Sequence, residues 1–310
     1  MLKVAVTGAS GFIGKRFIEY NRNRFRLKMI TLRNRKMSDI DLNGADVVVH
    51  FAGKAHDMTG GNDQDYFKVN TELTKDLAVQ AIKQGVSQFV YISSVKVYGE
   101  EDGVILDENT ECHPIDAYGK SKLLAEQWLW TVQSPTFRIA VIRPSLVYGP
   151  GVKGNMINLL KLADKAIPLP FGRINNMRSM VYLDNLVELI NKVMVEKAHG
   201  IFVGADQEPV STSRLVQLIR KFLGRKPNLL YLPGPVRKIL KGYKPSLYKR
   251  LFGSFVIGNK NNLEKLNFVP PFTTEYGLQK MVEWYKIEKE LDKQIQKTTP
   301  LLDREETSDF

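Results

Sequence analysis

Short apolar runs alternate with amphipathic stretches along the first two thirds of the chain. The runs are rich in valine and isoleucine and are continuous, which is the pattern of parallel strands buried on both faces. They cover residues 2–7, 27–32, 46–51, 88–93, 137–143 and 200–205. Helical patterns between them begin at residues 12, 66 and 118. This alternation predicts an α/β fold with a doubly wound parallel sheet.

The pattern changes after this point, because a proline- and glycine-rich turn at residues 144–151 marks the departure from the first domain. Asp184 is the expected N-cap of a helix that follows a short strand within residues 177–195. Further helices are expected at residues 156–166, 211–223 and 273–293, short helices within 227–252, and an irregular loop at 167–172. We assign the first domain to residues 1–146 and 178–205, a smaller C-terminal α/β lobe to 147–177 and 206–287, and a polar, frayed tail to 288–310.

Glycines recur between the first predicted strand and the first predicted helix, at Gly8, Gly11 and Gly14. The first permits a tight turn, and the third lets the helix pack on the strand. Small residues let the backbone approach a pyrophosphate at the helix N-terminus, where free N–H groups favour anions. In this context the motif indicates a dinucleotide site and a Rossmann-type sheet. The expected contacts are Gly8, Ser10, Gly11, Phe12, Ile13 and Gly14.

The end of the second predicted strand bears on the choice of dinucleotide. NAD-specific sites usually carry an acid there, whereas an arginine accommodates the 2′-phosphate of NADP. This chain has Arg33 and Arg35, and no acid before Asp39. The sequence therefore favours NADP(H), with Arg33 as first choice and NAD(H) as the alternative. A solvated basic loop would look the same.

Tyr118 and Lys122 are four residues apart in a helix-prone stretch, so their side chains share one helix face. A free phenol titrates near ~10, and a nearby ammonium lowers that pKa. The pair is a candidate general acid/base, although two solvated residues would have the same spacing. Ser94 follows the strand at 88–93, at the sheet edge where ligands bind. It is a candidate for hydrogen bonding a substrate oxygen, or an ordinary turn serine.

The sequence gives little support for a metal site, a reactive cysteine or a membrane-spanning segment. His50 and His56 lack the cysteine or carboxylate cluster of a metal site. The single cysteine, Cys112, excludes an intrachain disulfide, fits a reducing cytoplasm and has no activating partner in sequence. No apolar run reaches the roughly 18 residues of a transmembrane helix, and no signal peptide precedes the first strand. We therefore expect a cytoplasmic protein without a metal.

The net charge of +12 is local, because residues 209–263 hold twelve Lys and Arg and no Asp or Glu. The remainder of the chain is electrically balanced. Nucleic acid, an anionic small molecule or an acidic membrane surface would each suit this stretch, as would simple solvation. Surface aromatics are not interleaved as in nucleic-acid modules, so we expect no nucleic-acid partner.

Several motifs together resemble the extended short-chain dehydrogenase/reductases, within them those acting on nucleotide-sugars. The resemblance runs loosely from Lys3 to Tyr285. It rests on Thr7-Gly8-x-x-Gly11-x-x-Gly14, His50-Phe51-Ala52-Gly53, Val69-Asn70, Ser93-Ser94-x-x-Val97-Tyr98-Gly99, Tyr118-Gly119-Lys120-Ser121-Lys122, Arg143-Pro144-x-x-Val147-Tyr148-Gly149-Pro150 and Arg178-x-x-Val181-Tyr182-x-Asp184.

The resemblance implies roles by position. Tyr118 would be the acid/base, Lys122 would hold the nicotinamide ribose, and Ser94 would orient the reacting sugar oxygen. Cofactor contacts would further include Phe51, Ala52, Gly53, Asn70, Pro144 and Ser145. Substrate contacts would include Lys96, Asn155, Arg178, and Lys249 or Arg250. Phe171 could meet a base of the nucleotide or fill the core.

The resemblance leaves the reaction open. Related dehydratases carry Thr-Asp-Glu where this chain has Ser94-Val95-Lys96, so dehydration is not expected. We rank an NADP(H)-dependent 4-keto reductase of a UDP-4-keto-6-deoxy-N-acetylhexosamine, for surface polysaccharides, above a UDP-hexose or UDP-N-acetylhexosamine 4-epimerase with tightly bound NAD. A non-catalytic NADP-sensing regulator ranks last, because the acid/base pair is present. The implied partners are a UDP-sugar and a second copy, paired through the helices at residues 66 and 118.

Overall fold

The first domain is organised around one sheet. The computed structural model of the protein describes residues 1–54, 62–99, 103–258 and 260–298. The sheet has six strands in the order β10-β6-β4-β3-β1-β2, and every neighbouring pair is parallel. The strands are β1 Lys3–Thr7, β2 Arg26–Ile30, β3 Val47–His50, β4 Gln88–Ile92, β6 Arg138–Pro144 and β10 Gly200–Gly204. The predicted α/β class and doubly wound parallel sheet are confirmed.

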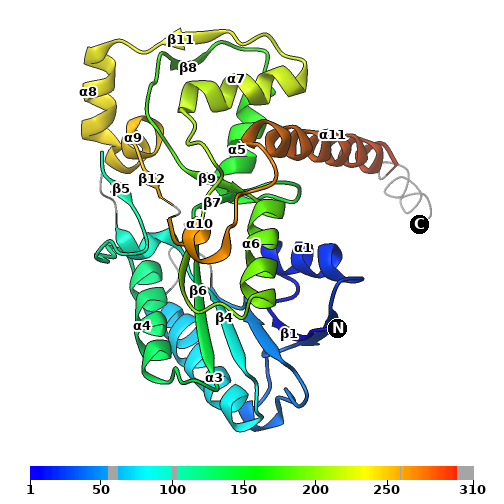
Figure 1. The fold of residues 1–310 in the computed structure, drawn as a ribbon. Coiled ribbons are helices and arrows are strands. Elements are labelled where there is room, and N and C mark those ends of the chain that lie inside the picture. The colour runs from blue at the N-terminus through cyan, green and yellow to red at the C-terminus, as the bar shows by residue number, and fades with distance from the viewer. Residues whose placement is uncertain (55–61, 100–102, 259, 299–310) are drawn as a thin grey trace, which may run out of the picture.

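Two helical layers cover this sheet (Figure 1). Helices α1 (Phe12–Asn21) and α6 (Leu183–Val195) pack on one face, with Phe17 and Leu186 in the shared core. Helices α3 (Leu73–Lys83) and α4 (Ala117–Thr131) cover the opposite face. The carboxyl ends of the strands therefore meet along one edge, where the register pairs Thr7 with both Ile30 and His50.

The helix expected at residues 66–85 is more complex than its sequence suggests. It starts earlier, with α2 (Asp63–Tyr66), and continues through a π-helical segment, η2 (Phe67–Glu72), into α3. Such π segments are frequent at functional sites, because they re-aim side chains within a continuous helix. Here the π segment carries Asn70.

Beyond the six-stranded sheet lie further helices and three short parallel strand pairs. The pairs are β7 Leu146–Tyr148 with β9 Met180–Tyr182, β8 Leu169–Gly172 with β11 Leu229–Tyr231, and β5 Ile105–Leu106 with β12 Val256–Ile257. The helices are α5 Gly154–Ala163, α7 Thr212–Leu223, α8 Gly234–Tyr243, α9 Pro245–Phe252, α10 Lys260–Leu266 and α11 Thr274–Thr298. Short 3₁₀ turns, η1 Met37–Asp39 and η3 Val95–Tyr98, complete the described structure.

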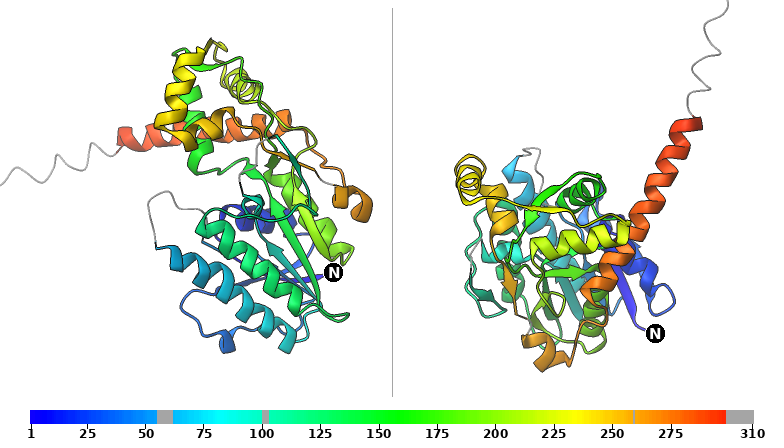
Figure 2. Two further views of the ribbon diagram at one scale, coloured as in Figure 1. Left: turned by 90° about the vertical axis from the view of Figure 1, so that its left-hand side faces the viewer. Right: turned by 90° about the horizontal axis from the view of Figure 1, so that it is seen from above.

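Three local predictions are wrong. The loop expected at residues 167–172 is largely strand β8, because its hydrogen-bond partner β11 lies about sixty residues away in sequence, at Leu229–Tyr231. Asp184 does not cap α6; it lies inside the first turn and accepts hydrogen bonds from Arg16 of α1 at 2.7 and 2.9 Å. Helix α11 continues to Thr298 and so includes part of the predicted tail (Figure 2).

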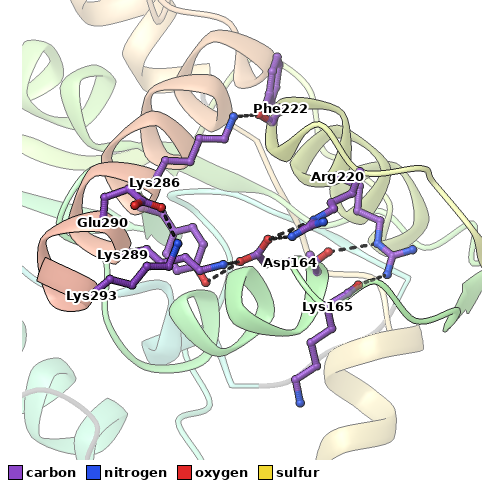
Figure 3. Close-up of polar contacts among 11 residues, drawn as sticks. Asp164, Lys165, Arg220, Phe222, Lys286, Lys289, Glu290 and Lys293 are labelled. Atoms are coloured by element: carbon purple, nitrogen blue, oxygen red, sulfur yellow. Dashed lines mark hydrogen bonds and ion pairs between the residues drawn. The ribbon is translucent and has the colours of Figure 1, made fainter. Parts of the chain in front are cut away.

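Arg220 of α7 joins the loop before β8 to the loop before β11 through hydrogen bonds (Figure 3). Its buried guanidinium donates hydrogen bonds to carbonyl oxygens before β8 and before β11. The acceptors are Ala163, Lys165, Ile167, Lys226, Pro227 and Asn228. Nearby, Asp164 pairs with Arg225 at 3.0 Å and with Lys289 of α11. These contacts join α5, α7 and α11 to the loops before β8 and β11. The division at residues 146/147, 177/178 and 205/206 stays a prediction.

None of the helices in the described ranges is long and apolar enough to cross a membrane. His56, which is not expected to bind a metal, and residues 299–310 of the predicted tail lie outside the described residues.

Candidate active site

The glycine motif forms a tight turn between β1 and α1. Gly8 has a φ of +69°, and a Cβ there would lie 2.5 Å from the backbone nitrogen of Ala52. A Cβ on Gly14 would lie 2.3 Å from the Gly8 carbonyl oxygen, so helix and strand meet without side chains. Helix α1 begins at Phe12, and Gly11 before it offers no side-chain cap. The amino end of the helix thus keeps its N–H groups for an anion, which fits a pyrophosphate.

The residues after β3 are tied to α4 by Asn70. Its side-chain oxygen accepts a hydrogen bond from the Lys54 backbone N–H at 2.8 Å, and its amide donates to Ser121 Oγ at 3.0 Å. Between them, a Cβ on Gly53 would lie 3.2 Å from Lys122 Nζ. Gly53 therefore leaves the space beside the lysine ammonium free of a side chain.

Replacing Gly53 with alanine tests this arrangement. The added methyl would lie 2.9 Å from Asn70 Oδ1. We expect Asn70 to move and its buried hydrogen bonds to weaken, which lowers the free energy of unfolding by about 1–3 kcal/mol. Urea denaturation measures the loss. Gly234→Ala is the control, because nothing lies within 4 Å of a Cβ there. Equal stability of the two variants would contradict the arrangement.

Tyr118 and Ser94 meet at the carboxyl edge of the sheet. Asp116 caps α4 by accepting a hydrogen bond from the Gly119 N–H at 2.7 Å, which starts the helix one residue before Tyr118. Ser94 follows β4 and accepts from the Lys96 N–H at 3.2 Å. Burial raises the pKa of the Tyr118 phenol, and its hydrogen bond with Ser94 only partly opposes this. The expectation that a nearby ammonium lowers this pKa is therefore wrong, and Tyr118 keeps its proton at neutral pH.

The Lys122 side chain is more deeply buried than that of Tyr118, one turn before it on α4. Its side chain is buried, and Nζ donates a hydrogen bond to the Ile92 carbonyl oxygen at 2.9 Å, above the Tyr91 ring at 4.7 Å from its centroid. Burial lowers the pKa of Lys122 to about 8. The ammonium is thus held at the end of β4, at the same sheet edge as Ser94.

A buried ion pair beneath these residues was not assigned a role from sequence. Glu126, one turn beyond Lys122 on α4, binds Arg143 of β6 at 2.5 Å and accepts a hydrogen bond from Ser93. An acid four residues after the lysine is the only sequence signal for it. These contacts join α4 to β6 and to the residue before Ser94, so they fix the distance between the helix and the sheet edge.

Ser145, next to Pro144 at the end of β6, is an expected cofactor contact. Its backbone N–H donates to the Gly204 carbonyl oxygen at 2.8 Å. Its buried hydroxyl has no hydrogen-bond partner among the described residues. A buried hydroxyl of this kind usually has a partner, so a bound group would suit it.

His50 is structural. Its Nδ1 lies 2.6 Å from Thr7 Oγ1 and its Nε2 lies 3.0 Å from Thr74 Oγ1, so it links β1, β3 and α3. Burial lowers the pKa of His50 to about 3, which keeps the ring neutral. Burial also raises the pKa of the Cys112 thiol, in agreement with an unreactive cysteine.

Arg33 and Arg35 lie in the exposed turn after β2. Because β2 is the neighbour of β1, this turn is at the same edge as the glycine motif. Asp39, the first acid after the strand, lies in η1 and is exposed. The structure thus places two cations, without an acid between them, beside the predicted dinucleotide site.

The expected substrate contacts fall into separate groups. Arg178 donates a hydrogen bond to the Gly253 carbonyl oxygen at 3.1 Å, which brings it to the end of α9, where Lys249 and Arg250 lie. Lys96 pairs with Asp116 at 3.8 Å. Asn155 lies exposed in the first turn of α5.

Phe171 packs inside the lobe, against Leu169, Ile174 and Val216, and is 6% exposed. Core filling therefore accounts for it, and the expectation of a contact with a base is wrong for this arrangement.

The parallel sheet and the residues at its carboxyl edge are typical of dinucleotide-binding oxidoreductases. In this class a tyrosine, a serine and a lysine lie at the same edge as the glycine motif. The model of the NAD dependent epimerase/dehydratase family matches residues 4–204. The chain belongs to this family, and it is an enzyme of the extended short-chain dehydrogenase/reductase class.

Comparisons with individual proteins agree with this family assignment. A UDP-glucose 4-epimerase of Vibrio cholerae is 36% identical, over 79% of this chain and 78% of its own length. The N-acetyl-alpha-D-glucosaminyl-diphospho-ditrans,octacis-undecaprenol 4-epimerase of Escherichia coli O157:H7 is 28% identical, over 91% and 94%. The solved structure of RMD from Pseudomonas aeruginosa complexed with NADPH has a TM-score of 0.75 and is 19% identical, over 93% of this chain and 98% of that one.

Proposed function

We propose that the protein uses NADPH to reduce the 4-keto group of a UDP-4-keto-6-deoxy-N-acetylhexosamine, for surface polysaccharide synthesis. The observation that carries this proposal is the pair Arg33 and Arg35, which follow β2 where NAD-specific sites have an acid. A 2′-phosphate suits these cations, and NADPH is the usual donor for net reduction.

The side chains suit that direction of reaction. When bound, the nicotinamide would supply the hydride that the C4 carbonyl accepts. Tyr118 keeps its proton, because burial raises its pKa, and so it can donate to the developing alkoxide. Ser94, which is hydrogen bonded to Tyr118, would hold the same oxygen. Lys122 would bind the ribose from its fixed position above Tyr91.

Dehydration has no support at the end of β4. Val95 is buried and has no proton to transfer, and Lys96 pairs with Asp116. Both positions lack the carboxylic acid that the expulsion of a C6 hydroxyl would need.

A 4-epimerase is the second candidate, and the names of two relatives favour it. Epimerisation would use Tyr118 and Ser94 in both directions and would keep the cofactor bound throughout. The carrier of the sugar would then be UDP or, as in the name of the second relative, a polyprenyl diphosphate.

Copurified cofactor and stoichiometry separate the two candidates. For the reductase we expect loosely held NADP and one NADPH oxidised per keto-sugar consumed, measured by absorbance and chromatography. Tightly held NAD, together with interconversion of UDP-sugars without net cofactor consumption, would overturn the reductase in favour of the epimerase.

Replacing Arg33 with aspartate tests the nucleotide preference. Removal of a charge-assisted phosphate contact should weaken NADPH binding by roughly 10–100-fold, while NADH binding is maintained or improved. Fluorescence titration with both nucleotides measures the ratio. The control is Arg22→Asp, because this exposed arginine lies at the other end of α1. If the unchanged protein already binds NADH more tightly, the reductase loses its main support.

A homodimer through the α2–α3 helix and α4 is also a proposal. It is supported by exposed apolar side chains on these helices, which are Val79, Ile82 and Leu124. A cytoplasmic location stays a prediction.

A further inference from the structure

Helices α8 and α9 form the outer corner of the lobe, away from the six-stranded sheet (Figures 1 and 2). Neither helix has a fully buried residue. On α8, Val236, Ile239 and Tyr243 are 45%, 67% and 87% exposed. Their spacing of three and four residues places them on one face of the helix. An apolar stripe therefore faces away from the protein.

The same helices are strongly basic. Lys238, next to Ile239, and Lys244, next to Tyr243, are exposed at the sides of the stripe. They belong to the long stretch, residues 209–263, that contains no Asp or Glu. We name the three apolar residues, together with Lys238 and Lys244, the α8 patch. It combines an apolar face with flanking cations and has no acid within its own segment.

Side-chain contacts on the inner side of α8 fix the orientation of this helix, so the apolar stripe faces outward. The Arg237 guanidinium lies over the rings of Tyr231 and Phe252, at 5.6 and 5.9 Å from their centroids. Lys241 Nζ lies 5.8 Å from the Tyr248 centroid. These contacts hold α8 against β11 and α9, and they leave Ile239 and Tyr243 outside.

We propose that the α8 patch binds the surface of an anionic lipid bilayer. Apolar side chains of an amphipathic helix enter the boundary between headgroups and acyl chains, and lysines attract anionic headgroups. A second copy of the chain is a poorer occupant, because it would bring the cations together. Nucleic acid would use the lysines but has no need of the Ile239 face. The proposal concerns where the enzyme is held and does not depend on the identity of its substrate.

Vesicle cosedimentation of the full-length protein tests the proposal. We expect it to sediment with vesicles containing phosphatidylglycerol and to stay in solution with phosphatidylcholine vesicles. The double variant Lys238→Gln/Lys244→Gln should lower the partition coefficient roughly tenfold or more. The double variant Ile239→Ser/Tyr243→Ser should lower it by a similar factor at constant charge.

A matched control removes two exposed lysines elsewhere, with Lys83→Gln/Lys161→Gln, and should retain binding. Turnover without vesicles should be unchanged in all variants, which separates a failure here from a failure of the proposed reaction. Absence of binding to anionic vesicles would overturn the proposal. So would binding that survives the Ile239 and Tyr243 changes, a dimer in sedimentation analysis that those changes dissociate, or binding to DNA in preference to vesicles.

Discussion

Tyr118→Phe is expected to lower turnover by roughly 10²–10⁴-fold, the usual contribution of a positioned general acid. The phenol is the proton donor that the site offers at neutral pH, because burial raises its pKa and Ser94 orients it. The ring contact with Tyr66, at 6.1 Å between centroids, remains in the variant. Affinity for the nicotinamide nucleotide should therefore stay within a few fold.

Steady-state rates and nucleotide titration together measure this effect. Tyr276→Phe is a suitable control, since this tyrosine is 40% exposed and lies on α11, away from the site. If Tyr118→Phe turned over at a rate close to that of the control, Tyr118 would not be the proton donor. A parallel loss of nucleotide affinity would instead indicate that the hydroxyl holds the cofactor.

Glu126→Ala should have the largest effect on stability. Glu126 and Arg143 are 1% and 4% exposed in their side chains and lie 2.5 Å apart. Removal of one partner leaves a buried charge without compensation, and such changes cost about 3–5 kcal/mol. Since α4 is joined to β6 by this pair, the positions of Tyr118 and Lys122 should loosen as well. Chemical denaturation followed by circular dichroism gives the free energy of unfolding.

Two variants sharpen this prediction. The double variant Glu126→Leu/Arg143→Met removes both charges and should recover much of the lost stability. Glu196→Ala removes the exposed partner of Lys192, a pair at 3.0 Å, and should cost less than about 1 kcal/mol. Similar losses for Glu126→Ala and Glu196→Ala would show that the buried pair does not hold α4 in place.

Much of the fold was predictable because its signals are local. A buried parallel strand needs a continuous apolar run, and the runs ending near Thr7, His50 and Ile92 carry that signal in their own residues. The glycine turn is equally local, since Gly8 and Gly14 exclude side chains where backbone must approach backbone. These features specify the sheet and the place of the nucleotide loop.

The geometry of the candidate site depends on contacts that no local pattern encodes. Asn70 reaches Ser121 across 51 residues, from a π segment that helical periodicity does not reveal. Burial also sets the direction of the Tyr118 pKa, and the pairing of β8 with β11 places Phe171 in the core.

The sequence by itself determined the alternation of strands and helices, the glycine turn, and the spacing that puts Tyr118 and Lys122 on one helix face. Only the tertiary structure decided which groups surround them: Ser94 at the phenol, Gly53 beside the ammonium, and the Glu126–Arg143 pair beneath. The physical reason is the distance along the chain over which each interaction acts. Periodicity and turn chemistry act between near neighbours, whereas burial, pKa shifts and buried ion pairs depend on segments brought together by folding.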